Sequence, residues 1–386
     1  MAGERVAGLL KQYRKCYQKA PREGRSRMLD EFCAMTGYHR KYAVALLNKA
    51  HEDAPACPRH RGKSYSEKAM RIIEKIWEAA GYPWSARLVE LLPLWLPWAQ
   101  AHMGKIDAAT REEILGISAR QIDRRLAAKK RTIKGRIYGR TKPGSLLKHH
   151  IPIKTEHWDV NEPGHLEIDL VSHSGPCASG EFIHSLNATD IHTQWGETRA
   201  IMGKGEAGVV EAIEDIRRAL PFALKSIDSD NGSEFINHHL CRYCAKHKIH
   251  FTRSRPYKKD DNAHIEQKNW THVRKIFGWM RLDTPDQLQA MNALYKGELR
   301  SMMNLFQPCV KLISKERVGS KLRRKYDKPT TPLDRLVACH KNTLPLPITK
   351  LFAQRENMDP FALSQKIERQ VRALTHTKKK LSKALP

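Results

Sequence analysis

Two stretches decide the fold: IDSDNGSEFIN at residues 227–237 and RSRPYKKDDNAHIEQKNW at residues 253–270. In the first, Asp230 directly follows a predicted strand. In the second, a basic loop leads into a helix predicted from Asn262, with Glu266 in its first turns. A third acid, Asp169, lies in the strand predicted at His165–Val171. Strand ends and adjacent helix starts converge on one edge of an α/β sheet, so we expect these three carboxylates to lie together.

Such a cluster favours a bound cation. Three converging carboxylates repel one another unless a cation lies between them, and Mg²⁺ prefers oxygen ligands while leaving positions open for water and substrate phosphate. Two such ions, roughly 4 Å apart, suit an in-line displacement at a phosphodiester. Asp230 alone, placed before Asn-Gly, is more typical of an N-cap or an Asx-turn, so this interpretation depends on the full triad.

The chain around the triad alternates between strand and helix patterns. Strands are expected at residues 165–171, 182–189, 194–202, 223–227 and 249–252, and helices at 205–220, at 233–248 and from 262. This order predicts an α/β domain with a mixed sheet.

The two quoted stretches closely resemble the catalytic core of integrase-type transposases of bacterial insertion sequences. These belong with retroviral integrases in the Asp-Asp-Glu group of the ribonuclease H-like fold. Between Asp230 and Glu266 lie 35 residues, a hallmark spacing of that group, and 60 lie between Asp169 and Asp230. The resemblance covers residues 160–285 and implies a five-stranded sheet flanked by helices. It assigns catalysis and metal binding to Asp169, Asp230 and Glu266, with two Mg²⁺ ions that Mn²⁺ can replace.

The resemblance also implies an activity: Mg-dependent DNA cleavage at the ends of a mobile element, followed by strand transfer into target DNA. Two neighbouring carboxylates compete for the assigned roles. Glu167 shares the strand face of Asp169, and Asp228 lies two residues before Asp230. Choosing Asp228 would lengthen the second spacing to 37 residues.

A zinc site is the lesser alternative in two places. Retroviral integrases carry a His-His-Cys-Cys domain before the core, but residues 1–150 lack that spacing. The second candidate set lies between Asp230 and the fifth predicted strand, where the resemblance implies a plain helix and where Cys241 and Cys244 suit core contacts. Its members are His238, His239, Cys241, Cys244 and His247.

Charge is unevenly distributed along the 386 residues. The net charge is +28 at pH 7, yet residues 151–285 hold 17 Lys/Arg and 19 Asp/Glu, a net of −2. The segments on either side of residues 151–285 therefore carry the whole excess of positive charge. This pattern predicts flanks that hold phosphates around a centre whose work needs carboxylates.

Both N-terminal segments have helix-turn-helix character. In residues 1–50, helices at Ser26–Met35 and His39–Lys49 flank Gly37, a pattern also common in other helical hairpins. In residues 66–130, a short helix at Thr110–Leu115 precedes a turn, and Ser118 is the expected N-cap of a helix at Ala119–Lys130. The residues expected to contact DNA at the start of that helix are Arg120, Gln121, Arg124 and Arg125.

Further DNA contacts are expected from basic segments beside the core. Residues 131–150 have six Lys/Arg, no acid and several Gly and Pro, which predicts a linker lying along phosphates, or equally a solvated hinge. The contact residues expected in the linker are Arg131, Lys134, Arg136 and Arg140. Those expected near the metals are Arg253, Arg255, Lys258, Lys259 and Lys268, with Asn269 beside them.

The fold expected is therefore multidomain: an all-α helix-turn-helix region, an α/β ribonuclease H-like core with a five-stranded mixed sheet, and a basic C-terminal region. The expected boundaries are 1–50, 66–130, 131–150 for the linker, 151–285 for the core, and 286–386. In the last region, residues 287–306 and 363–374 have helical patterns, and residues 308–332 read as basic and irregular.

The remaining expectations concern setting and partners. Isolated cysteines and the lack of a long apolar run or a secretory leader indicate an intracellular protein, in the bacterial cytoplasm with the nucleoid, and no membrane contact. The expected partner is double-stranded DNA, both element ends and target, bound by a homo-oligomer. Two other functions stay open: a ribonuclease H-like nuclease without strand transfer, and a helix-turn-helix DNA-binding protein with a catalytically dead core.

Overall fold

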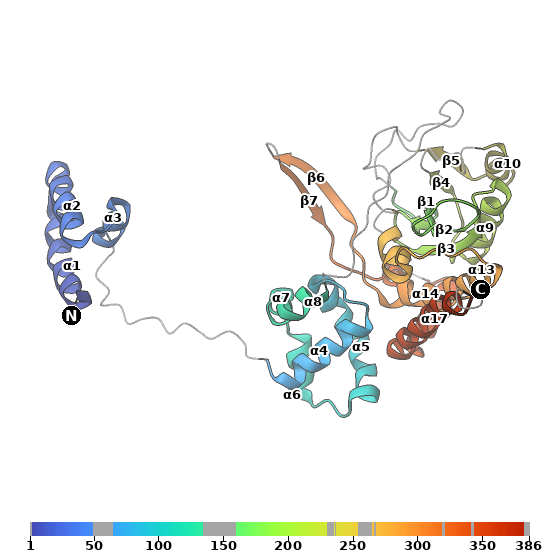
Figure 1. Cartoon of the computed structure of the whole chain (residues 1–386), viewed down its shortest axis with the longest axis horizontal. Helices are drawn as coiled ribbons and strands as arrows, with labels where there is room; N and C mark the ends of the chain where they lie inside the picture. Colours follow the sequence, from blue (N-terminus) through green and yellow to red (C-terminus); the bar gives the residue numbers. More distant parts are fainter. Residues whose placement is uncertain are drawn as a thin grey trace. The chain divides into compact units, whose positions relative to one another are not determined.

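A computed structural model of the chain describes residues 2–48, 65–133, 160–229, 235, 237–253, 265, 268–318, 321–340 and 343–381. Two compact units result, residues 1–64 and 65–386 (Figure 1). Asp230 and Glu266 lie outside the described residues. So do Lys134, Arg136, Arg140, Arg255, Lys258 and Lys259.

The first unit is a three-helix group with a small core. Its helices are α1 (Ala2–Lys19), α2 (Arg22–Thr36) and α3 (Arg40–Asn48). Gly37 ends α2 at φ 70°, and its N–H donates to the carbonyl of Cys33. Phe32 and Leu47 are fully buried between the helices. The helices predicted on either side of Gly37 are confirmed, whereas their DNA contact stays a prediction.

The second unit begins with five helices. They are α4 (Glu67–Ala79), α5 (Ser85–Met103), α6 (Ala108–Leu115), α7 (Ala119–Arg125) and α8 (Ala127–Ile133). Ser118 caps α7 as predicted, by accepting a hydrogen bond from the N–H of Gln121. The helix predicted at 119–130 is divided at Leu126, whose side chain turns into the core. Trp84 is exposed, while Trp95 is fully buried.

A five-stranded mixed sheet follows, as predicted. Its strands are β1 (His165–Ser172), β2 (Ile183–Asp190), β3 (Gly196–Met202), β4 (Ser226–Ser229) and β5 (His250–Arg253). The strand order is β3-β2-β1-β4-β5. β2 is antiparallel to β1 and β3, while β4 is parallel to β1 and β5. The fourth strand lies about three residues later than expected, because Ser226 rather than Ala223 begins the pairing with β1.

Helices cover both faces of the sheet. Leu166 and Ile168 of β1 pack with α9 (Glu206–Ala219) and α10 (His238–Lys246). Val171, on the opposite face of β1, packs with α13 (Pro285–Lys296) and with the segment formed by η3 (Asn269–Arg274) and α12 (Lys275–Phe277). Glu167 and Asp169 alternate with Ile168 along β1, so they share this second face.

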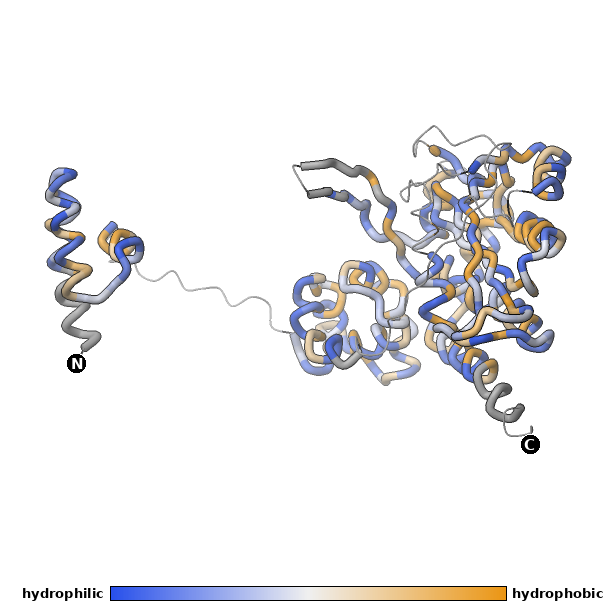
Figure 2. Tube along the Cα trace, turned by 45° about the horizontal axis from the view of Figure 1, so that its top comes forward, coloured by the Kyte–Doolittle hydropathy of each residue, from blue (hydrophilic) through white to orange (hydrophobic). Residues whose placement is uncertain are grey.

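The C-terminal region completes the second unit. Its remaining helical elements are α14 (Glu298–Ser301), η4 (Met302–Phe306), α15 (Pro332–Ala338), α16 (Leu346–Glu356) and α17 (Pro360–Leu381). One apolar core joins α4 and α5 to η4, α15, α16 and α17. Hydrophobic residues are distributed along the described helices and strands of the second unit (Figure 2). None of the described helices combines the length and apolar character needed to cross a membrane.

The basic stretch at 308–332, predicted as irregular, needs correction. It contains an antiparallel hairpin of β6 (Leu312–Val318) and β7 (Lys321–Tyr326), which extends away from the body of the unit (Figure 1). In the sequence of this stretch, charged residues fall at odd and at even positions. The stretch therefore lacks the alternation of apolar and polar residues that predicts a half-buried strand.

Candidate active site

Asp169 lies on the central strand of the sheet. It pairs across β1 and β2 with Asn187, and its side chain is partly exposed. Its carboxylate accepts hydrogen bonds from the side-chain amide of Asn269, at 2.6 Å from Oδ2, and from the backbone N–H of Leu170, at 2.8 Å from Oδ1. A carboxylate held in this way is oriented without being enclosed, which leaves it accessible for a ligand.

The segments that lead to Asp230 and Glu266 both arrive beside Asp169. Ser229, the last residue of β4, pairs in parallel with Ile168. The backbone N–H of Ile265 donates to Oε2 of Glu167 at 3.2 Å. Asp230 and Glu266 are the next residues in the sequence after Ser229 and Ile265. The described residues just before both acids therefore contact the strand that carries Asp169.

Glu167 and Asp228, the competing carboxylates, are much less accessible. Glu167 is 1% exposed and is bonded to the Ile265 backbone. Asp228 is 3% exposed, and its Oδ1 accepts the hydroxyl proton of Thr252 on β5 at 2.7 Å. These two groups suit internal roles that hold strands and the incoming helix together. Their burial favours Asp169 over Glu167 as the ligand on β1.

A chain of polar side chains extends from Asp169 across the sheet. Asn269 donates to Asp169 and accepts from the amide of Asn187 at 3.0 Å, and Asn187 in turn accepts from the hydroxyl of Thr198 at 3.1 Å. Asn187 is fully buried. Asn269 was expected at DNA, but its amide is directed to Asp169 instead. The sequence signal for this role was the presence of two polar residues, Asn187 and Thr198, on neighbouring strands in register with Asp169.

Two residues predicted to contact DNA are buried. Arg253 is 5% exposed and Lys268 is 4% exposed. Neither side chain therefore has the surface position that was expected of a DNA contact. Arg253 is buried although it ends the edge strand β5, and Lys268 lies on the packed side of the helical segment after Glu266.

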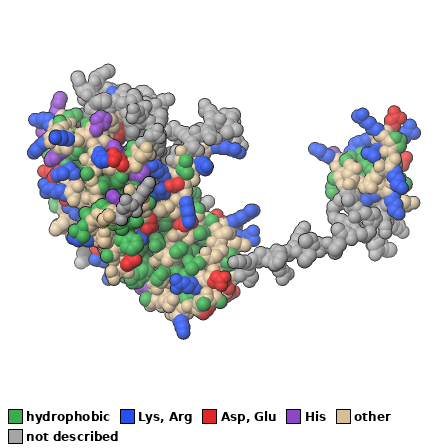
Figure 3. Space-filling view, turned by 180° about the vertical axis from the view of Figure 1, so that it is seen from behind, with side chains coloured by type: hydrophobic (Ala, Val, Ile, Leu, Met, Phe, Trp, Pro, Cys, Tyr) green, Lys and Arg blue, Asp and Glu red, His purple; other side chains and the backbone are tan. Residues whose placement is uncertain are grey.

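The predicted contacts of the second helix-turn-helix lie at the surface. Arg120, Arg124 and Arg125 of α7 are exposed, Gln121 is half-buried, and Arg131 of α8 is exposed. Arg125 also donates to the carbonyl of Tyr65 at 3.5 Å. Lys and Arg side chains are spread over the face shown in Figure 3. Accessibility is a precondition of DNA contact, and these residues meet it.

Zinc ligands do not gather on α10. Cys244 is buried in the sheet core, and burial raises its pKa to about 12. Nowhere in the described part of the chain do three or more His, Cys, Asp or Glu side chains gather in a way that suits a metal ion. Two members of the predicted Mg²⁺ triad are outside that part. The donor set itself, three carboxylates with Asp169 partly exposed, has the hard oxygen chemistry that Mg²⁺ requires.

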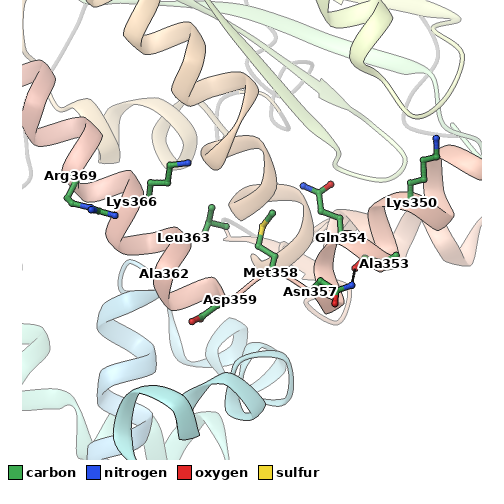
Figure 4. Close-up of a pocket in the computed structure, with 10 residues that line it drawn as sticks. All are labelled: Lys350, Ala353, Gln354, Asn357, Met358, Asp359, Ala362, Leu363, Lys366 and Arg369. Carbon is green, nitrogen blue, oxygen red and sulfur yellow. Dashed lines mark hydrogen bonds between the residues drawn. The ribbon is translucent and has the colours of Figure 1, made fainter.

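One hollow elsewhere in the described part of the second unit lacks this acid chemistry. A hollow of about 670 Å³ lies between α16 and α17 (Figure 4). Its only carboxylate is Asp359, which contacts Nε2 of His102 at 2.6 Å and accepts from the backbone N–H of Phe361. A single paired carboxylate does not make a metal site.

Comparison with known proteins gives one sequence relative. No protein-family model matches the chain. Uncharacterized protein y4rM of Sinorhizobium fredii is 35% identical over 322 residues, which cover 83% of this chain and 91% of that protein.

Solved structures with some likeness are catalytic cores of two viral integrases. The magnesium complex of the HTLV-2 integrase core has a TM-score of 0.29 and 11% identity, covering 38% of this chain and 90% of that one. The BIV integrase core has a TM-score of 0.28 and 15% identity, covering 45% and 94%. At these TM-scores the likenesses carry no argument about fold or activity.

Proposed function

The chain belongs to the same family as uncharacterized protein y4rM of Sinorhizobium fredii, and we propose, from the arrangement of its carboxylates, that it is a DNA transposase. In the proposed reaction, water first cleaves a phosphodiester at the end of a mobile element and leaves a 3′-hydroxyl. That hydroxyl then attacks a phosphodiester of the target DNA. Both steps are in-line phosphoryl transfers, so no covalent bond to the protein forms.

One observation supports the proposal above the others. Ser229 pairs with Ile168, and Ile265 donates to Glu167, so the residues just before Asp230 and Glu266 flank the strand of Asp169. Together with the 35-residue spacing between Asp230 and Glu266, this favours one carboxylate cluster built from three separate segments.

Asp169, Asp230 and Glu266 would hold two Mg²⁺ ions, for which Mn²⁺ would substitute. When bound, the ions supply charge neutralisation at the attacking and leaving oxygens. Asn269 holds the Asp169 carboxylate in place through its 2.6 Å hydrogen bond, and Asn187 fixes the orientation of Asn269. The chain's part in the chemistry is thus to position carboxylates and DNA before reaction.

The helical units would recognise the element's ends, and the protein would act as a homo-oligomer on DNA in the bacterial nucleoid. Arg120, Gln121, Arg124 and Arg125 would contact bases near the start of α7. Arg131, Lys134, Arg136 and Arg140 would contact phosphates, as would Arg255, Lys258 and Lys259 near the carboxylates.

Strand transfer with pre-cut DNA ends tests the proposal. We expect Mg-dependent joining to target DNA by the wild-type chain. Glu266→Gln keeps the side chain's size but removes its charge, so joining should fall at least several hundredfold while DNA binding persists. Nicking without joining would favour the nuclease alternative, and DNA binding with neither would favour a catalytically dead regulator. Near-normal joining by Glu266→Gln would contradict the triad.

A further inference from the structure

A second cavity lies behind the helical segment that follows Glu266, and its chemistry is opposite to that of the carboxylate site. It has a volume of about 720 Å³ and lies within the second unit, where the α4–α5 turn meets η3, η4 and α17. Five basic side chains line it: Arg87, Lys268, His272, Lys275 and Arg372. We call the first four of these residues and their cavity the cation pocket.

Two bases of the cation pocket are deeply buried, whereas Arg87 is half-buried and Lys275 is exposed. Lys268 is 4% exposed and His272 is 7% exposed. Nε of Arg87 is buried and has no hydrogen-bond partner among the described residues. Lys275 lies at the mouth, where its ammonium donates to the carbonyl of Gly81. Burial lowers the pKa of His272 well below its ordinary value, and the nearby cations of Lys268 and Arg87 lower it further.

Carboxylates do not compensate these charges. The two glutamates of the lining, Glu78 and Glu368, pair instead with Lys75 and Arg372, at 3.6 Å in each case. In the described part of the chain, no carboxylate is paired with Arg87 or Lys268. A buried charge without a partner destabilises a fold by several kcal/mol, so such clusters call for an anion.

Much of the remaining lining is apolar, although Thr271, Gln307 and Ser364 also belong to it. Ile276, Met302 and Met303 face the cavity, together with Pro83 from the α4–α5 turn. An anion with an apolar or aromatic body therefore matches the cavity better than a small inorganic ion. The volume is within the range of pockets that enclose a ligand of nucleotide size.

We propose that the cation pocket binds a nucleotide, with its phosphate beside Lys268 and Arg87 and its base against Ile276, Met302 and Met303. The nucleotide is either free or the terminal residue of a DNA strand. The pocket is distinct from the carboxylate site: Asn269 directs its amide to Asp169, whereas the preceding residue, Lys268, lines the cavity.

Thermal unfolding of the full chain with deoxyadenosine monophosphate as the probe tests this proposal, without Mg²⁺ and without cleavage, so failure of the transposase proposal would leave the result intact. We expect the probe to raise the Tm of the wild type, and uncharged deoxyadenosine to have no such effect. Lys268→Met should raise the Tm of the unliganded protein, because an uncompensated buried charge is lost, and should weaken probe binding at least tenfold. Arg87→Met provides an independent variant with the same expected loss of binding.

Lys246→Met, a change at an exposed lysine of α10, is the matched control and should alter neither quantity. A 5′-phosphorylated oligonucleotide distinguishes the two sources: competition with the probe identifies a DNA strand end, and its absence identifies a free nucleotide. The proposal is overturned if the wild type does not respond to millimolar probe, or if both pocket variants respond as the wild type does.

Discussion

The helical segment at residues 268–275 separates two charged regions that are built in opposite ways. On one side is the acid edge, formed by Glu167, Asp169 and Asp228; on the other is the cation pocket. Each carboxylate of the acid edge accepts a hydrogen bond from a protein donor: Ile265, Asn269 and Thr252 respectively. In the cation pocket, Arg87 and Lys268 have no carboxylate partner within the described residues. Protein groups thus orient the acids, whereas the buried bases need an external anion.

The largest expected difference in strand-transfer activity is between a variant at Asp228 of the acid edge and a variant at Asp230, two residues later in the sequence. Asp230→Asn should lower strand transfer at least several hundredfold, because it removes a charge proposed to hold the ions. Asp228→Asn should be much milder, since Asp228 is buried against Thr252. The measurement is a strand-transfer assay of both variants, made under conditions in which they bind equal amounts of DNA. The reverse order would show that Asp228 is the ligand.

Asn269→Ala should have the next largest effect. The amide of Asn269 orients Asp169, and losing a partner that orients a metal ligand typically costs 10–100-fold in metal affinity or activity. We expect a decrease of that size together with a higher Mg²⁺ requirement for half-maximal rate. Asn292→Ala is a suitable control, because Asn292 binds only the backbone of Ala200 on β3. A lower rate at an unchanged Mg²⁺ requirement would argue against a role through Asp169.

Buried histidines near the two regions predict a loss of stability in acid. Burial lowers the pKa of His173 to about 3, and its Nε2 lies 2.8 Å from the hydroxyl oxygen of Ser185. Below about pH 6.5 the His173 imidazole binds a proton in the unfolded chain but stays neutral in the folded chain. The folded state therefore loses stability as pH falls from about 6.5 towards 3, by about 2 kcal/mol at pH 5.

Urea unfolding at pH 7 and pH 5 measures this loss. His173→Gln should make the free energy of unfolding differ less between pH 7 and pH 5, since the variant lacks the imidazole that is protonated only in the unfolded chain. His250→Gln, at an exposed position of β5, should leave the difference unchanged. If His173→Gln also left it unchanged, His173 would not be the titrating group.

The smallest expected effects concern DNA recognition by the basic flanks. Arg120→Ala should weaken binding to the cognate end by about 1–3 kcal/mol and leave random DNA unaffected, as loss of a base contact does. Replacing Arg131, Lys134, Arg136 and Arg140 by Ala should weaken both equally. The slope of log affinity against log salt should become shallower by up to about 3.6. If the linker variant lost only binding to the cognate end, the linker rather than α7 would be the segment that contacts bases.

The sequence alone predicted the sheet because its signals are local. Apolar alternation in β1 and β2, the Gly turns and the spacing of the acids all lie within short stretches. The fate of Lys268 was not predictable in this way, since its burial depends on α5 and α17, which are distant in the sequence. Asn269 was misread for the same reason: its partners, Asp169 and Asn187, lie on two other strands. The β6–β7 hairpin was missed because its pairing is not marked by an apolar face.

Crystals of the full chain soaked in Mn²⁺, with anomalous scattering recorded at the manganese edge, test the central claim most directly. The account predicts two peaks at the acid edge, both within coordination distance of carboxylate oxygens of Asp169, Asp230 and Glu266, and both lost in Asp169→Asn crystals. Peaks bound by Glu167 or Asp228 instead, or a wild-type map without manganese at Asp169, would contradict it.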